Sequence, residues 1–408
     1  MITYRAAWVV PISGPPIRDG WVVVDRGRIV ALGHGDAPHP EVREARDLGD
    51  AALMPGLVNA HTHLELSYLR GKVAPAREFV AWVRDLLRAR RRLEDAAAPD
   101  IVAAVGRGIE ECLASGSALI GDISNTLITF EPLAKSPLAA VVFHELLRFH
   151  EPEPERFVDQ ACRAIDLLPG TDAVRAGLAP HAPYSVAPLV FRALRRAIDR
   201  RPFLRSSVHL SESAAEVQFI ARGDGPWRGV LEDLGAFDPG WVAPGVSPVQ
   251  YLHENGFLDW RVLAVHGVQM SDADLARLAR LGTTLVTCPR SNRHTGAGTP
   301  PIARFYASGV RVAVGTDSLA STPDLSVFAE LAEMRRLAPA VAAGTLLDSA
   351  TRQGARALGF ESELGSIEPG RRARLLAVAV PPRTDDVEEY LVSGIAAERI
   401  QWVGEDAG

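Results

Sequence analysis

The strongest constraint on the fold is a strand-and-helix alternation that occurs eight times in the middle of the chain. Short apolar runs bounded by Gly, Pro or charged residues are typical of buried strands. They alternate with longer helical patterns, such as Phe79–Arg92, Ile101–Ala114, Phe191–Arg200 and Asp272–Leu281. The expected strands are Leu57–Ala60, Ala118–Asp122, Ala139–Phe143, Val174–Ala179, Ser206–His209, Val262–His266, Thr284–Thr287 and Val310–Gly315. This repetition predicts an α/β fold, a parallel (β/α)8 TIM barrel.

Both ends of the chain have a different pattern, with short strand-like runs and no long helices. A chain of 408 residues is also long enough for one large domain and a smaller one. We expect residues 1–55 and 350–408 to form a composite β-sandwich domain and residues 56–349 to form the barrel. The segment Gly223–Asn255, rich in Gly, Pro and Trp, is expected to cap the barrel mouth. The expected terminal strands are Ala7–Pro11, Trp21–Asp25, Ile29–Ala31, Leu375–Val380 and Ile400–Val403.

Charge and cysteine content limit the partners and the compartment. The formal net charge of −6 argues against nucleic-acid and anionic-membrane partners, which favour a basic face. Three widely spaced cysteines fit neither a disulfide framework nor a CxxC metal site. The N-terminus lacks a signal-peptide pattern, and no run approaches the ~20 apolar residues of a membrane span. We therefore expect a cytoplasmic protein with a small-molecule substrate, and a homodimer is the commonest closed assembly.

Histidines and one aspartate follow the expected barrel strands. In a TIM barrel the carboxyl ends of the strands meet at the active site, so these side chains should converge. The period-two spacing of His61 and His63 directs both imidazoles to the same side of a strand. Imidazole nitrogens and a carboxylate are ligands that Zn2+ and Fe2+ accept, which predicts a divalent metal site. The residues at the strand ends are His61, His63, His181, His209, His266 and Asp317.

Four motifs, PGLVNAHTH, HLSES, LAVHG and VGTDS, occur in an order and spacing that resembles the amidohydrolase superfamily. The resemblance is to the branch of aminohydrolases that act on nucleobases and triazines, and it covers almost the whole chain. It implies metal ligation by His61, His63, His209 and Asp317, and contact of His266 with the attacking water or the tetrahedral intermediate. The fourth expected strand ends in LAPHAPYS without a bridging lysine, so we expect one metal ion, Zn2+ or Fe2+.

Glu212 indicates the type of reaction. In the deaminases that this chain resembles, a glutamate three positions after the strand-end histidine transfers a proton to a ring nitrogen. Water adding to an amidine-like carbon places charge on that nitrogen, and a protonated carboxyl can neutralise it. Asp317 would accept the proton of the water and His266 would polarise the developing alkoxide. Glu216, one helical turn further on, is expected to have a structural role.

The pattern around His61, with Phe79 and Trp82 downstream and Pro289-Arg290-Ser291-Asn292 later, is most similar to the aminodeoxyfutalosine deaminases of menaquinone biosynthesis. This resemblance implies removal of the 6-amino group from an adenine nucleoside that bears a benzoate group. An ADL-like turn usual near the C-terminus of that family is replaced here by Ala373-Arg374-Leu375. The expected substrate-binding residues are His181, Glu65, Trp82 and Ser291, with Ser67, Phe79, Asn292 and a possible anion contact at Arg148.

Four other functions remain open from the sequence. A triazine-type chlorohydrolase or another deaminase could use the same metal site, and an amidohydrolase could open another cyclic C–N bond. Glu212 favours protonation of a ring nitrogen over lactam opening, but it does not exclude a halide as leaving group. A non-catalytic scaffold is the remaining alternative. Loss of a metal ligand would indicate a scaffold, and no ligand is missing here.

Overall fold

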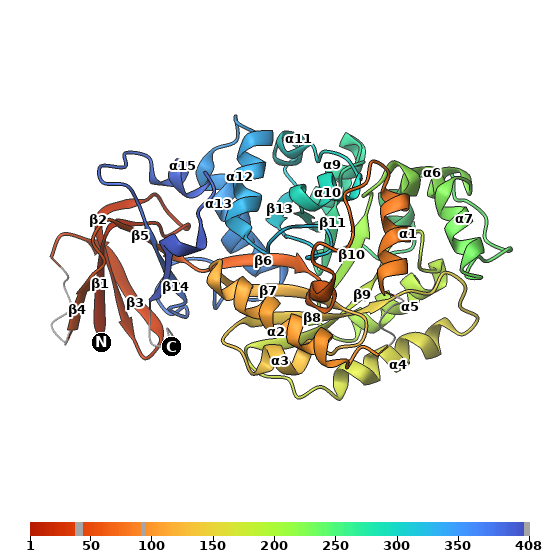
Figure 1. Ribbon diagram of the computed structural model, residues 1–408, viewed down its shortest axis with the longest axis horizontal. Coiled ribbons are helices and arrows are strands. Elements are labelled where there is room, and N and C mark those ends of the chain that lie inside the picture. The colour runs from red at the N-terminus through yellow and green to blue at the C-terminus, as the bar shows by residue number, and fades with distance from the viewer. Residues whose placement is uncertain (37–43, 91–94, 404–408) are drawn as a thin grey trace.

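The computed structural model describes residues 1–36, 44–90 and 95–403. Eight parallel strands form one sheet in the order β13-β12-β11-β10-β9-β8-β7-β6, and a bridge between Thr62 and Asp317 joins its two edges. The predicted barrel is therefore confirmed (Figure 1). Its strands are β6 (Leu57–Thr62), β7 (Ser117–Ser124), β8 (Ala139–Leu146), β9 (Val174–Pro180), β10 (Ser206–Leu210), β11 (Val262–His266), β12 (Thr284–Thr287) and β13 (Arg311–Val314).

Helices surround the barrel, so its strands are almost entirely buried on both faces. Many of these helices start as sequence rules predict: a proline stands at the beginning of α2, α4 and α5, and Ser271 and Asp274 form a capping box on α9. Residues 91 and 92 of one expected helix lie outside the described residues. The surrounding helices are α2 (Pro99–Ala114), α3 (Phe130–Ala134), α4 (Pro154–Asp166), α5 (Pro188–Asp199), α6 (Ala214–Arg222), α8 (Pro248–Glu254), α9 (Asp272–Leu281), α11 (Ile302–Ala307) and α12 (Val327–Leu337).

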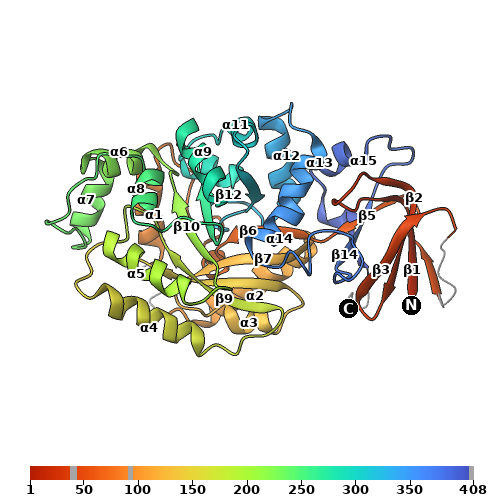
Figure 2. The same ribbon diagram turned by 180° about the vertical axis from the view of Figure 1, so that it is seen from behind.

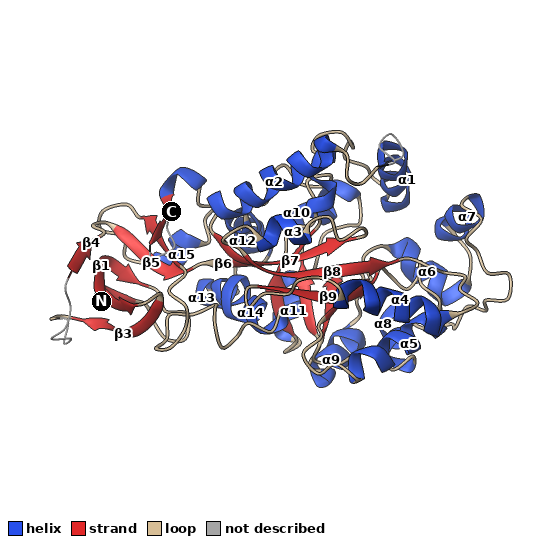
Figure 3. Cartoon of the chain, turned by 90° about the horizontal axis from the view of Figure 1, so that it is seen from below, coloured by secondary structure: helices blue, strands red, loops and turns tan. Residues whose placement is uncertain are grey.

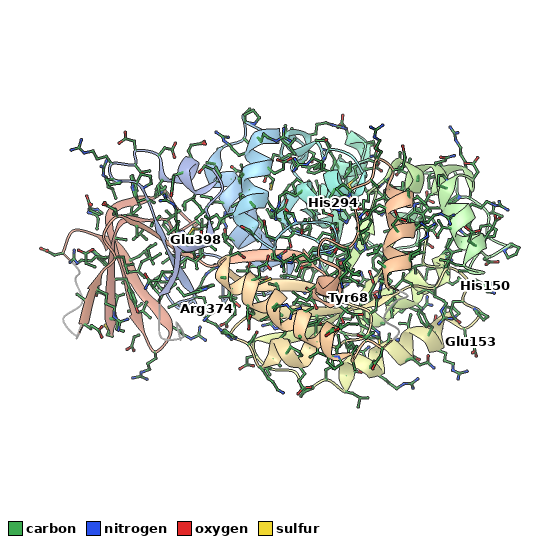
Figure 4. The ribbon with its side chains drawn as sticks, in the orientation of Figure 1. Tyr68, His150, Glu153, His294, Arg374 and Glu398 are labelled. Atoms are coloured by element: carbon green, nitrogen blue, oxygen red, sulfur yellow. The ribbon has the colours of Figure 1, made fainter. Side chains whose placement is uncertain are left out.

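The two chain ends meet in a second, mainly antiparallel sheet at one end of the molecule (Figures 1 and 2). Its strands are connected in the order β15-β14-β5-β1-β2-β3, and β4 pairs in parallel with β1. In Figure 4, Arg374 and Glu398 lie near the junction with the barrel, whereas His150 and Glu153 lie at the opposite end. The strands are β1 (Ile2–Val9), β2 (Ile17–Asp25), β3 (Arg28–His34), β4 (Glu44–Asp47), β5 (Ala51–Pro55), β14 (Leu375–Ala379) and β15 (Ile400–Val403).

The segment between the last barrel helix and β14 is shared between the two parts. Helix α13 (Ala343–Asp348) leads into one π-helical turn, Ser349–Gln353, and then into α14 (Gly354–Ala357). The π-helical turn contacts β13 and β6, and α14 contacts β6. The chain enters the terminal sheet at Leu375 and also forms the short helix α15 (Val387–Leu391).

Two helices outside the regular alternation stand over the barrel mouth. Helix α1 (Phe79–Arg90) lies in the connection from β6 to β7, and α7 (Pro226–Asp233) lies in the segment that was predicted to cap the mouth. Figure 3 shows both helices at the end of the barrel that is remote from the terminal sheet. Across the described parts of the chain, every helix is too short or too polar to cross a bilayer.

Candidate metal centre and active site

Five side chains meet at the carboxyl ends of the barrel strands. His61 lies in β6, His209 in β10 and His266 at the end of β11, while His63 directly follows β6 and Asp317 stands three positions after the end of β13. His61, His63 and Asp317 offer ligand atoms that all lie within 4.8 Å of one another, and the same holds for His61, His209 and His266. The convergence that was expected from the strand positions is thus present in the fold.

The imidazoles of this cluster are suited to bind a cation. Burial lowers the pKa of His61 and of His63 well below the ordinary value, and the nearby imidazoles lower both further. The Nε2 atoms of these two rings lie 3.2 Å apart. The Nδ1–H of His209 donates to the carbonyl oxygen of His181 at 2.8 Å, which leaves its Nε2 lone pair free. Neutral nitrogens that face one another in a buried site fit a shared metal ion.

Asp317 is held so that one carboxylate oxygen faces the histidines. Its Oδ2 accepts hydrogen bonds from the hydroxyls of Ser291 at 2.5 Å and Ser321 at 3.2 Å. Its Oδ1 lies 3.4 Å from Nε2 of His63 and 3.8 Å from Nε2 of His61. Both serines therefore direct Oδ1 towards the candidate metal position.

The strand ends that carry these groups have an unusual backbone. Ser211, His266 and Asp317 have φ values of 53°, 78° and 61°, a region that residues other than glycine rarely adopt. Such conformations cost roughly 1–3 kcal/mol each and cluster at functional sites. Gly315 serves a related purpose, because a Cβ atom there would lie only 2.8 Å from Cβ of His61. At the barrel mouth, a strained backbone is tolerated because it places these side chains.

Glu212 lies beside this cluster and is almost fully buried. Its Oε1 is 3.6 Å from Nε2 of His266. Burial raises the pKa of Glu212 well above its ordinary value, and the charges of Asp317 and Glu216 raise it further. Glu216 holds the turn below, because its carboxylate accepts the backbone N–H groups of Ser211 at 2.8 Å and of Glu212 at 2.9 Å. These contacts agree with the structural role expected for Glu216.

A pocket opens above the cluster. Its floor contains His63, His181, His209, Glu212, His266 and Asp317. Its wall is mostly apolar and comes from α1 and α7, where the rings of Trp227 and Tyr184 stack with centroids 3.8 Å apart. The apolar wall residues are Leu66, Phe79, Trp82, Val83, Leu86, Leu87, Trp227, Val230, Leu231 and Leu234.

One corner of the pocket is polar and was not identified from the sequence. The guanidinium of Arg90 donates to Asn125 at 2.9 Å, and the Asn125 amide donates to Glu145 at 2.7 Å. The other carboxylate oxygen of Glu145 is buried without a hydrogen bond among the described residues. Glu145 stands at the end of β8, so the rule that identified the strand-end histidines applies to it as well. Arg90 ends α1, where sequence alone gives it no special position.

The expected substrate-binding residues fall into two groups. His181 and Trp82 line the pocket, as does Phe79, whereas Glu65 and Ser291 are absent from its lining. Glu65 instead accepts hydrogen bonds from Ser124 at 2.7 Å and from the backbone of Thr126 at 3.2 Å.

The other candidates also lie outside the pocket lining. Ser67 is buried, and Asn292 contacts His266 from behind. Arg148 is half exposed and lies over the ring of Phe157 at 5.3 Å. Of the expected substrate-binding residues, His181, Trp82 and Phe79 therefore line the pocket, and the others do not.

The sequence matches the Amidohydrolase family over residues 52–397. The chain belongs to this family. The aminodeoxyfutalosine deaminase of Deinococcus radiodurans is 32% identical over 363 residues, which cover 83% of this chain and 81% of the relative. The 5-methylthioadenosine/S-adenosylhomocysteine deaminase of Desulforudis audaxviator is also 32% identical, over 388 residues that cover 90% of this chain and 83% of the relative. The predicted amidohydrolase is thereby confirmed.

Two solved structures cover nearly the whole fold. Helicobacter pylori aminofutalosine deaminase in complex with methylthio-coformycin superposes with a TM-score of 0.85 and is 26% identical, over 99% of this chain and 97% of that one. An adenosine deaminase from Xanthomonas campestris with bound zinc superposes with a TM-score of 0.82 and is 28% identical, over 98% of this chain and 90% of that one. The barrel, the terminal sheet and their arrangement are thus those of amidohydrolase deaminases.

Proposed function

We propose that this protein is a metal-dependent deaminase that hydrolyses the exocyclic amine of an adenine nucleoside substituted at the 5′ position. The observation that carries the proposal is the buried Glu212 carboxyl, which faces the pocket 3.6 Å from His266 and beside the candidate metal ligands. A ring nitrogen needs a proton donor there when its neighbouring carbon is attacked. Both relatives named above are deaminases of adenine nucleosides by name, which supports the same chemistry here.

The residues that would hold the metal are His61, His63, His209 and Asp317. Their neutral nitrogens and single carboxylate suit one Zn2+ or Fe2+ ion, and the structural neighbour from Xanthomonas campestris contains zinc. A bound divalent ion would lower the pKa of water towards neutrality and so supply the nucleophile.

The surrounding side chains would then move protons. Asp317 would accept a proton from the attacking water, because its Oδ1 faces the ligand cluster while Ser291 and Ser321 hold its Oδ2. Glu212, whose burial favours the protonated form, would donate to the ring nitrogen next to the carbon under attack. The amine would leave as ammonia once it has received a proton. His266 would stabilise charge on the incoming oxygen.

The wall of the pocket favours an apolar or aromatic 5′ substituent. Two tryptophans, Trp82 and Trp227, and the leucines of α1 and α7 make most of the wall apolar. Arg90, in the same pocket, could pair with a carboxylate at the far end of such a substituent. This combination fits the benzoate-bearing nucleoside aminodeoxyfutalosine best. Participation in menaquinone biosynthesis follows if that is the substrate.

Two alternatives are less well supported. A triazine-type chlorohydrolase would share the metal site and could use the same proton donor at a ring nitrogen, but both relatives named above are deaminases. A non-catalytic scaffold would not need the strained backbone at His266 and Asp317 or the complete ligand set.

Ammonia release by zinc-loaded and iron-loaded protein tests the proposal directly. The panel should contain aminodeoxyfutalosine, 5-methylthioadenosine, S-adenosylhomocysteine and adenosine, with chelator-treated protein as the blank. We expect kcat/KM to be highest for aminodeoxyfutalosine and lower for S-adenosylhomocysteine, whose zwitterionic end would face a mostly apolar wall. Metal-loaded protein that releases no ammonia from any of the four would refute the proposal.

A further inference from the structure

Asn292 contacts the Nδ1 edge of the His266 ring, on the side away from the pocket. Its side-chain nitrogen Nδ2 lies 2.9 Å from Nδ1 of His266, and both residues are buried. We propose that Asn292 fixes the proton of His266 on Nε2. His266 then acts as a hydrogen-bond donor into the site, and it is prevented from becoming a further ligand of the metal. The inference rests on the proposed metal site and not on the identity of the nucleoside.

The two neutral forms of His266 have opposite properties at the pocket. When the proton is on Nε2, Nδ1 has a lone pair, and an amide N–H can donate to it. When the proton is on Nδ1, Nε2 has the lone pair and can only accept a hydrogen bond or bind a cation. The partner at Nδ1 therefore determines what the ring does on the pocket side.

Groups on both sides of the ring favour the proton on Nε2. On the rear side, Asn292 presents the nitrogen of its amide. On the pocket side, Oε1 of Glu212 lies 3.6 Å from Nε2, beyond hydrogen-bond distance, and this carboxyl favours a proton on Nε2 when it is ionised. Once Glu212 has given up its own proton, it is a carboxylate, and an Nε2 lone pair in front of it would be repelled.

The consequence for the metal is geometric. His61, His209 and His266 offer ligand atoms that lie within 4.8 Å of one another. An Nε2 lone pair on His266 could therefore add a fourth imidazole to the ion that His61, His63 and His209 would hold, in competition with water. A proton on Nε2 removes this possibility and gives the incoming oxygen a donor instead.

The backbone of Asn292 is anchored by hydrogen bonds and by an ion pair at the start of its helix. It lies in α10 (Pro289–Thr295), and its backbone N–H donates to the carbonyl of Cys288 at 3.0 Å. The neighbouring Arg290 donates to the fully buried Glu330 at 2.6 Å and ties the start of α10 to α12. A buried ion pair next to Asn292 thus anchors the start of α10, which carries the amide that contacts His266, and Asn292 is a positioning residue.

The first measurement needs no variant. In zinc-loaded protein with nitrogen-15-labelled histidine, the shifts of the two ring nitrogens distinguish the neutral forms of each ring, and loss of signals in His266→Gln assigns this residue. We expect His266 to have a protonated Nε2 and an unprotonated Nδ1. A protonated Nδ1 in the wild-type protein would overturn the inference.

The second measurement replaces the hydrogen-bond donor beside Nδ1 of His266 by an acceptor. Asn292→Asp replaces the donor by a carboxylate that accepts from Nδ1–H, so Nε2 should become a lone pair. We expect zinc to bind more tightly in competition with a chelator, and kcat to fall on the order of 100-fold. Asn292→Leu, which favours neither form, should lose less activity and leave zinc affinity unchanged.

Asn255→Asp is the matched control, because Asn255 is also buried, and it pairs with Arg192 and Tyr251 outside the pocket lining. It should change neither zinc affinity nor kcat. If Asn292→Asp loses activity while His266 keeps its proton on Nε2, the inference fails, whatever the outcome of the substrate panel.

Discussion

The floor and the wall of the pocket differ in how they are built. The floor consists of side chains at the ends of barrel strands, and two of them, His209 and His266, lie in the ladder between strands β10 and β11. The wall consists of α1 and α7, which stand in connections outside the regular alternation. The floor is polar and carries charge, whereas the wall is mostly apolar.

This difference separates chemistry from specificity. A reaction that depends on a metal and on proton transfer needs atoms placed within tenths of an ångström, and parallel strands supply that rigidity. A substrate that varies in its 5′ group needs a wall that can change without disturbing the sheet, and connecting segments permit that. Variants of the floor should therefore lower kcat for every substrate, while variants of the wall should alter only the ranking of substrates.

Asp317→Asn should have the largest effect. The change removes a metal ligand and the expected proton acceptor at once, so we expect kcat to fall by more than about 10,000-fold for all substrates. The fold should persist, because Ser291 can still donate to the remaining side-chain oxygen. Circular dichroism and thermal unfolding check the fold, and ammonia release checks the activity. Near-normal turnover would mean that Asp317 is not part of the reaction.

Glu212→Gln should have the next largest effect. An amide is similar in size but cannot give a proton to a ring nitrogen, so kcat should fall roughly 100- to 10,000-fold. Substrate affinity and metal content should change little, because Glu212 is not among the expected metal ligands. Fluorescence titration with substrate and elemental analysis measure both. Glu216→Gln provides the contrast: we expect lower thermal stability, because it would replace the carboxylate that accepts two backbone N–H groups.

Trp227→Ala tests the wall. The indole stacks on Tyr184, and losing a buried side chain of this size removes roughly 1.5–3 kcal/mol of apolar contact. We expect kcat/KM for a 5′-aryl nucleoside to fall about 10- to 100-fold, with a much smaller change for adenosine. Trp260→Ala is the control, because Trp260 is half exposed and precedes β11 outside the pocket lining. An equal loss of kcat/KM for both nucleosides would show that Trp227 affects the reaction itself and not only recognition of the 5′ group.

Arg90→Gln should have the smallest and most selective effect. Arg90 is partly exposed, so its attraction for a carboxylate is partly screened by solvent. We expect about a 10-fold rise in KM for nucleosides with a carboxylate, a smaller rise at high salt, and no change for neutral nucleosides. Arg148→Gln is the matched control, since Arg148 lies away from the pocket over Phe157. A larger effect at Arg148 would reverse the assignment of the anion contact.

Much of the floor was predictable because barrel topology converts sequence position into spatial position. His61, His209, His266 and Asp317 each follow a strand-like run, and the carboxyl ends of parallel strands share one end of the sheet. Glu145 satisfies the same rule and was missed because the expected strand stopped at Phe143, whereas β8 continues to Leu146. The error of a few residues at a strand end thus removed one polar group from the predicted site.

The sequence by itself determined the barrel, the union of the chain ends and the identity of the candidate metal ligands. The barrel and the union of the chain ends follow from period and strand order, which are local or topological properties. The resemblance to the family singled out the four candidate ligands among the residues at the strand ends. Only the tertiary structure decided that Arg90 and Trp227 line the pocket, that Ser291 supports Asp317, and that Asn292 contacts Nδ1 of His266. These contacts depend on side-chain directions in segments far apart in the chain, and no periodic pattern encodes those directions.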